Sequence, residues 1–118
     1  MKTILDKPIV AIDFDGTITL GDTRVWANDF SSNDILIRRP QVVDWVIKNR
    51  DCMYLILWTC RCGEDLQRAV NYCRERLGIE FDAINENIVP YETSAKILAD
   101  YYVDDKAVTL QQLGGLTW

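Results

Sequence analysis

The sequence predicts a single α/β domain built on a parallel sheet. Short apolar runs alternate along the chain with segments of helical periodicity, in the order βαβαβαβ. The apolar runs have no alternating polar positions, as expected for strands that a parallel sheet buries on both faces. A chain of 118 residues that is 48% hydrophobic has the size of one domain and can bury a core. We therefore expect residues 1–118 to form one domain with helices on both faces of the sheet.

The first half of the chain contains two expected strands and one expected helix. The run Pro8–Asp13 (PIVAID) ends at an acid and is typical of a buried strand. The polar segment Gly16–Arg39 predicts a long, partly packed loop. Pro40 suits the first turn of a helix, so Gln41–Asn49 is expected to be helical. Met53–Thr59 (MYLILWT) is the second apolar run and predicts the second strand.

The second half begins with the clearest helix of the sequence. In Gly63–Leu77 the apolar residues recur every three to four positions, and Gly78 follows as a stop signal. The remaining expected elements are shorter: a strand at Phe81–Ile84, a helix capped by Thr93 or Ser94 that runs through Ala99, and a strand at Tyr101–Val103.

The composition excludes several classes of function. With no His, the chain cannot be a Ser-His-Asp hydrolase, a Cys-His protease or a histidine phosphatase. A formal charge of −5 argues against a nonspecific grip on nucleic acid, which depends on clustered Lys and Arg. The four cysteines lack a usual zinc spacing and are expected to be reduced thiols. Without a signal peptide or an apolar run of roughly 20 residues, we expect a cytoplasmic protein with no membrane partner.

Polar residues with chemical potential follow the ends of the predicted strands. The carboxyl ends of parallel strands meet at one edge of a sheet, where ligands gather. Each residue alone could equally be a solvated strand end or a turn former, so the prediction rests on their convergence. They are Asp13 and Asp15 after the first strand, Thr59 after the second, Lys96 at the third helix, and Asp104 and Asp105 after the fourth strand.

The pair Asp13 and Asp15 can divide the work of phosphoryl transfer. Two residues apart on an extended backbone, their carboxylates are expected on the same side. One carboxylate can attack phosphorus, while the other protonates the leaving oxygen and later activates water. Gly16 and Thr17 then allow a sharp turn whose N–H groups can hold phosphate oxygens.

Several other residues complete the expected site. The clustered acids would repel a phosphate dianion unless Mg²⁺ bridged them. Lys96 would add a positive charge, and Thr59 a hydrogen bond, to the phosphoryl oxygens. Arg61 could hold another substrate oxygen or form a surface salt bridge. Asn85 and Asn87 could line the same rim or serve as turn formers.

Taken together, these residues resemble the four motifs of the haloacid dehalogenase (HAD) superfamily, in order. The segment VAIDFDGT resembles motif I, Thr59 motif II, Lys96 motif III and YYVDD motif IV. The resemblance covers about the whole chain. It implies a HAD-like three-layer α/β/α sandwich with a parallel, Rossmann-like sheet.

The resemblance also implies a role for each residue. Asp13 would be the nucleophile and a metal ligand, and Asp15 the general acid/base whose backbone carbonyl also binds Mg²⁺. Asp104, with Asp105 directly or through water, would complete the metal site. Asp15 sets the chain apart from the dehalogenase branch, which lacks this acid, and favours phosphoryl transfer. The short stretches around Thr59 leave no room for a cap domain, so the site should be open, or closed by a second subunit in a homo-oligomer.

The sequence therefore predicts a Mg²⁺-dependent phosphohydrolase that cleaves a phosphomonoester through an aspartyl-phosphate at Asp13. Two alternatives stay open. The same chemistry could act on phosphorylated nucleic-acid ends, which a basic rim would favour, or the chain could be a catalytically silent Mg²⁺-binding or regulatory module. The set Asp13, Asp15, Lys96 and Asp104 weighs against a silent module, because binding alone needs no general acid.

Overall fold

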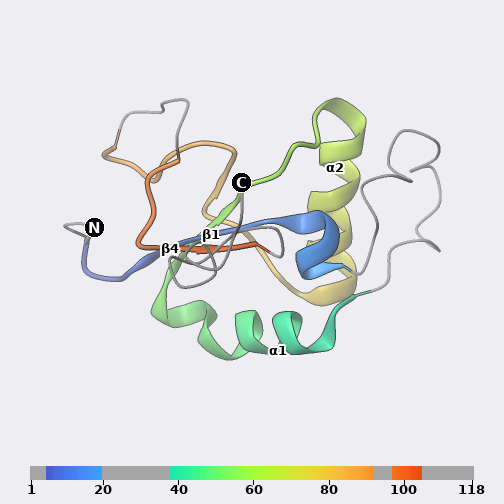
Figure 1. Cartoon of the computed structure of the whole chain (residues 1–118), viewed down its shortest axis with the longest axis horizontal. Helices are drawn as coiled ribbons and strands as arrows, with labels where there is room; N and C mark the ends of the chain where they lie inside the picture. Colours follow the sequence, from blue (N-terminus) through green and yellow to red (C-terminus); the bar gives the residue numbers. More distant parts are fainter. Residues whose placement is uncertain (1–4, 20–37, 92–96, 105–118) are drawn as a thin grey trace, which may run out of the picture.

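A parallel sheet of 4 strands forms the centre of the molecule, with the order β3-β2-β1-β4 (Figure 1). The structure is a computed structural model that describes residues 5–19, 38–91 and 97–104. Each strand lies within one of the predicted apolar runs, which confirms the parallel α/β fold. The strands are β1 (Ile9–Ile12), β2 (Tyr54–Leu57), β3 (Ala83–Ile84) and β4 (Tyr101–Val103).

Two longer helices connect the first three strands. Helix α1 (Pro40–Asn49) has its proline in the first turn, as predicted. Helix α2 (Gly63–Tyr72) continues as the helical segment η4 (Cys73–Leu77) and ends at Gly78. Gly78 has a left-handed φ of 70°, and its N–H donates to the Cys73 carbonyl. Two short helical segments complete the set, η1 (Phe14–Ile18) and η3 (Arg50–Cys52).

Both longer helices cover the same face of the sheet. Val10 and Ile12 of β1 belong to a cluster that also holds Val43 and Val46 of α1 and Ala69 of α2. A right-handed crossover that always steps in one direction, from β1 to β2 to β3, places its helices on one face. No helix of the described residues is long and apolar enough to cross a membrane.

The opposite face is covered by chain without helical structure in the part that the structure describes. Ile9 and Ala11 of β1 pack there against Ile88, Ile97 and Ala99. The predicted helix through Ala99 is therefore wrong over Ile97–Ala99; its expected caps, Thr93 and Ser94, lie outside the described residues. The physical reason is tertiary: the side-chain oxygen of Asn87 accepts the Leu98 N–H at 2.7 Å, and Ile97 and Ala99 pack against β1.

Two aspartates fix the register of the outer strands. Asp100, just before β4, accepts the Ile9 N–H at 2.7 Å and donates its own N–H to the Ile9 carbonyl at 2.8 Å. Asp82, just before β3, makes the same pair of bonds with Leu55, both at 2.8 Å. In the resulting register Ile12 pairs with Val103, so the residues that follow these two emerge side by side.

Candidate functional site

The candidate site lies where the chain leaves the central strand β1. The Asp13 N–H donates to the Val103 carbonyl at 3.0 Å, and the Trp58 N–H donates to the Ile12 carbonyl at 2.8 Å. Asp13 is thus flanked by the ends of β4 and β2, which continue into Asp104 and Thr59. The structure brings these three predicted residues to one edge of the sheet, whereas Lys96 and Asp105 lie outside the described residues.

This edge also contains the point at which the order of the strands reverses. From β1 the chain moves through β2 to β3, then returns across the sheet to place β4 on the other side of β1. Ligands of open α/β sheets bind in the crevice at such a reversal, beyond the carboxyl ends of the strands. The reversal lies between β1 and β4, so it coincides with Asp13 and Asp104.

The chain turns sharply directly after Asp13. Asp15 has φ −68° and ψ 120°, and Gly16 has φ 84° and ψ −6°, which are the central angles of a type II β-turn. The second central position of this turn requires a positive φ, which glycine adopts without strain. The Oδ1 atom of Asp13 accepts the Phe14 N–H at 2.8 Å and so caps the start of η1. The predicted sharp turn at Gly16 is confirmed, but it begins one residue earlier than predicted, at Asp15.

Arg39, directly before α1, holds this turn. Its guanidinium donates to the Gly16 carbonyl at 3.0 Å and to the Thr17 carbonyl at 3.2 Å, and its N–H donates to the Ile18 carbonyl at 2.7 Å. Sequence reasoning missed this residue. The partners lie more than twenty positions away, and no local motif marks the arginine.

Asp15 forms a buried ion pair with Arg61. The guanidinium donates from Nε and Nη2 to the two carboxylate oxygens, both at 2.8 Å. The side chain of Arg61 is 0% exposed and that of Asp15 10% exposed, so the guanidinium is closed to solvent and only a small part of the Asp15 side chain reaches it. The sequence predicts either a substrate contact or a surface salt bridge for Arg61. The structure shows a buried ion pair instead. The prediction that the carboxylates of Asp13 and Asp15 lie on the same side assumed an extended backbone through both residues. The extended backbone ends at Asp13, so this assumption does not hold.

The surroundings of Arg61 explain why a charge is tolerated there. The guanidinium lies over the ring of Phe14, with its carbon 4.8 Å from the ring centroid. Its Nη1 donates to the Asp65 carbonyl in the first turn of α2 at 3.3 Å. Phe14 in turn packs edge-on against Tyr72 of α2. The helix and the turn after β1 thus enclose the ion pair together.

Thr59 is held by a residue that follows β3 and by a residue of its own loop after β2. Its N–H donates to the side-chain oxygen of Asn85 at 2.8 Å, and its hydroxyl accepts the Arg61 N–H at 3.2 Å. Asn85 follows β3 with φ 53°, a left-handed conformation that Asn tolerates better than most residues. Asn85 and Asn87 thus act as turn and loop formers, and Asn85 also positions Thr59.

Comparison with known proteins gives the family but no activity. No protein-family model matches the sequence, and no curated protein matches it. A solved structure of a conserved protein from Bacteroides thetaiotaomicron is 34% identical, with a TM-score of 0.64 over 87% of this chain and 79% of that one. This chain belongs to the family of that Bacteroides protein.

The edge of the sheet carries oxygen atoms of the kind that bind hard metal cations. Asp13 and Asp104 carry two carboxylates at the ends of adjacent strands. Mg²⁺ prefers such ligands. Among the described residues, no three acidic, Cys or His side chains group closely enough to hold a metal. Asp15 contributes no carboxylate to such a group because it is bound to Arg61, and Asp105 lies outside the description.

The cysteines of this member of the family lie in three parts of the fold: Cys52 ends η3, Cys60 and Cys62 follow Thr59 at the edge of the sheet, and Cys73 begins η4. All four are free thiols; Cys52, Cys60 and Cys62 are exposed, and Cys73 is buried in η4. Burial raises the pKa of the Cys73 thiol to about 12, although the nearby charge of Arg61 acts in the opposite direction. Burial also raises the pKa of Tyr72. Both groups are neutral at physiological pH and belong to the core.

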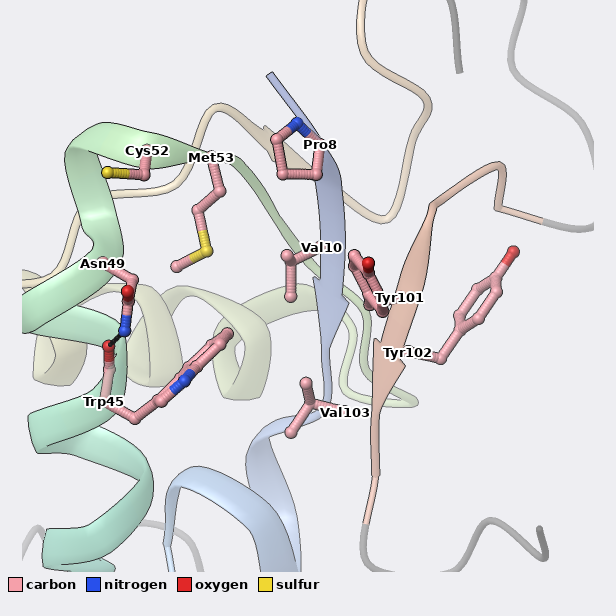
Figure 2. A pocket seen from close by; sticks show the side chains of 9 residues that line it. All are labelled: Pro8, Val10, Trp45, Asn49, Cys52, Met53, Tyr101, Tyr102 and Val103. Carbon is pink, nitrogen blue, oxygen red and sulfur yellow. Dashed lines mark hydrogen bonds between the residues drawn. The ribbon is translucent and has the colours of Figure 1, made fainter. Parts of the chain in front are cut away.

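A pocket of about 370 Å³ lies on the flank of the sheet, between α1 and β4 (Figure 2). Its lining carries no charge, and Trp45 faces Val10 and Val103 across it. Phosphoryl chemistry needs charged groups, so this pocket does not supply the reacting centre. Its lining residues are Pro8, Val10, Trp45, Asn49, Cys52, Met53, Tyr101, Tyr102 and Val103.

Proposed function

We propose that this protein is a Mg²⁺-dependent phosphohydrolase that cleaves a phosphomonoester through an aspartyl-phosphate at Asp13. The observation that carries the proposal is the register of the sheet. It puts Asp13 at the point of strand reversal, with Thr59 and Asp104 following the two neighbouring strands. This is the order of acids and hydroxyl that the resemblance to the HAD superfamily requires.

The reaction would proceed in two balanced steps. A carboxylate oxygen of Asp13 attacks phosphorus, the ester P–O bond breaks, and Asp15 gives a proton to the leaving oxygen. Asp15 then takes a proton from water, the water oxygen attacks phosphorus, and the bond to Asp13 breaks to release phosphate. The bond from the Phe14 N–H to Asp13 fixes the orientation of the nucleophile for the first step.

The other predicted residues would bind the phosphoryl group. Thr59 accepts a bond from Arg61, which orients its hydroxyl so that the hydroxyl hydrogen can be donated to a phosphoryl oxygen. Lys96 would provide a positive charge. Mg²⁺, held by Asp13, Asp104, Asp105 and the Asp15 carbonyl, would offset the repulsion between carboxylates and phosphate.

We place the chain in the short, capless branch of the HAD superfamily, with a three-layer sandwich as its full architecture. The all-parallel sheet supports this assignment. Between β2 and β3 the described chain contains only α2, η4 and short connections, which leaves no space for a cap there. An open edge of this kind could accept a bulky phosphoester.

The decisive test is hydrolysis of 4-nitrophenyl phosphate by wild type and by Asp13→Asn. Loss of the nucleophile should lower kcat by about 10³-fold or more. Asp51→Asn is a matched control, because Asp51 is exposed and precedes β2, at the opposite end of the strands. EDTA should abolish the wild-type rate, and added Mg²⁺ should restore it. A wild-type rate in Asp13→Asn would exclude covalent catalysis at this residue, and a rate insensitive to EDTA would exclude the metal.

A panel of sugar phosphates, nucleotides and 5′- and 3′-phosphorylated oligonucleotides extends the same assay. A preference for the oligonucleotides would favour action on nucleic-acid ends. Failure to hydrolyse any member in the presence of Mg²⁺ would favour the silent binding module instead.

A further inference from the structure

The buried ion pair between Arg61 and Asp15 indicates that Arg61 acts through Asp15. We propose that Arg61 is a positioning residue, which fixes the carboxylate of Asp15 for its acid–base role without contacting the substrate. This inference rests on the proposed function, since it assigns a purpose to Arg61 only if Asp15 transfers protons.

The geometry of the pair determines how Asp15 is presented. Two parallel bonds of 2.8 Å, from Nε and Nη2, hold both carboxylate oxygens in the plane of the guanidinium. An ionised carboxylate has about four lone-pair sites, and this pair uses two of them. The remaining sites can still hold or accept a proton, but only along directions that Arg61 defines.

Arg61 is itself fixed by three contacts. The ring of Phe14 lies beneath it, the Asp65 carbonyl accepts from Nη1, and the Thr59 hydroxyl accepts from its backbone N–H. Because the Arg61 side chain is 0% exposed, its guanidinium could contact a phosphate only if these contacts were broken. A role as a direct substrate grip is therefore disfavoured.

The pair also resists separation during a reaction. Removing one partner of a buried ion pair leaves the other charge without compensation in apolar surroundings. Asp15 is consequently expected to keep its bond to Arg61 while it transfers protons. The network runs from Asn85 through Thr59 and Arg61 to Asp15, and so joins the ends of β3, β2 and β1.

This role makes Arg61 variants resemble Asp15 variants in their dependence on the leaving group. A general acid matters most where the leaving oxygen is basic. Arg61→Met should lower kcat/KM for an alkyl phosphate at least about 10-fold more than for 4-nitrophenyl phosphate, as Asp15→Asn should. When Asp15→Asn is already present, adding Arg61→Met should change kcat/KM for the alkyl phosphate less than about 3-fold. Both substitutions affect the same step, the proton transfer to the leaving oxygen.

Two further variants keep the experiment decisive. Arg61→Lys retains the charge but loses the two-pronged geometry, and the double variant Asp15→Asn/Arg61→Met removes both charges together, so both should fold even if Arg61→Met does not. Arg50→Met is the matched control: Arg50 pairs with Asp82 at 3.0 Å, is partly exposed, and precedes β2. It should leave both rates unchanged, and circular dichroism checks folding throughout.

The outcomes separate the two proposals. Equal losses on alkyl and aryl phosphates in Arg61→Lys, or a full-sized effect of Arg61→Met without Asp15, would overturn the positioning role and leave the phosphohydrolase intact. A raised KM with unchanged kcat on both substrates would instead make Arg61 a substrate ligand. A wild-type protein without Asp13-dependent activity would overturn the proposed function, and the positioning role with it.

Discussion

At the scale of single residues, the site depends on side chains whose partners lie far along the chain. Arg61 meets Asp15 across 46 positions, and Arg39 reaches the Gly16 carbonyl across 23. Each arginine has several donors in a fixed plane, which suits it to hold a carboxylate or two adjacent carbonyls. The acids were visible in the sequence because they end apolar runs, whereas these arginines stand in no comparable pattern.

Cys73 makes the stability of the protein depend on alkaline pH. A thiol in the unfolded chain titrates near about 8.5, whereas burial raises the pKa of Cys73 in the folded chain to about 12. Cys73 therefore keeps its proton to a higher pH in the folded chain than in the unfolded chain. Its contribution to the free energy of unfolding is fully present below a pH of about 8.5 and is lost as the pH rises toward 12. The loss should approach about 1.4 kcal/mol per pH unit.

Urea unfolding under reducing conditions at pH 8 and pH 10 measures this dependence. The free energy of unfolding of Cys73→Ala should fall less between the two pH values than that of wild type. Cys52→Ala, which changes an exposed thiol, should keep the wild-type dependence. Identical dependence in all three proteins would show that Cys73 does not titrate in this range.

At the scale of elements, two of the three described glycines with a positive φ have different structural roles. Gly16 turns the chain after β1 at φ 84°, and Gly78 ends the helix at φ 70°. Around Gly78 an added Cβ would meet nothing within 4 Å, so a substitution there tests backbone conformation alone. The helix ends were predictable because stop signals are local; the turn at Gly16 was predictable for the same reason.

Replacing each of these glycines by alanine separates stability from activity. Both Gly16→Ala and Gly78→Ala should lower the free energy of unfolding by about 1–2 kcal/mol, the cost of a left-handed alanine. Only Gly16→Ala should also lower kcat for 4-nitrophenyl phosphate, because this turn sets the position of Asp15. Thermal unfolding and the phosphatase assay measure the two effects. An equal loss of activity in both variants would contradict a special role for the turn.

At the scale of the whole molecule, the strand order decides which residues share an edge. β4 pairs with β1 on the side opposite β2, and this places Asp104 next to Asp13. The return crossing from β3 to β4 covers the second face with Ile88, Ile97 and Ala99. A candidate cation site thus exists only in the folded chain, since its ligands come from strands at opposite ends of the sequence.

Binding of Mg²⁺ should therefore stabilise the folded protein. At a Mg²⁺ concentration about 100 times the Kd, the gain is about 2.7 kcal/mol, because the unfolded chain has no assembled site. A Mg²⁺ titration followed by thermal unfolding measures the rise in Tm. Asp104→Asn should reduce this rise strongly, and Asp51→Asn, which changes an exposed carboxylate at the other end of the sheet, should not. A Tm that ignores Mg²⁺ in wild type would argue against a metal at this edge.

Local sequence patterns were sufficient to predict the order of the strands and the first two helices, the parallel sheet, and the acids at the ends of β1 and β4. Apolar runs, helical periodicity and stop signals are local patterns, so they could be read without the fold. Only the tertiary structure decided that α1 and α2 share one face, that Ile97–Ala99 is not helical and that Arg61 is buried against Asp15. These features depend on crossover direction and on contacts between distant segments, which no local pattern encodes.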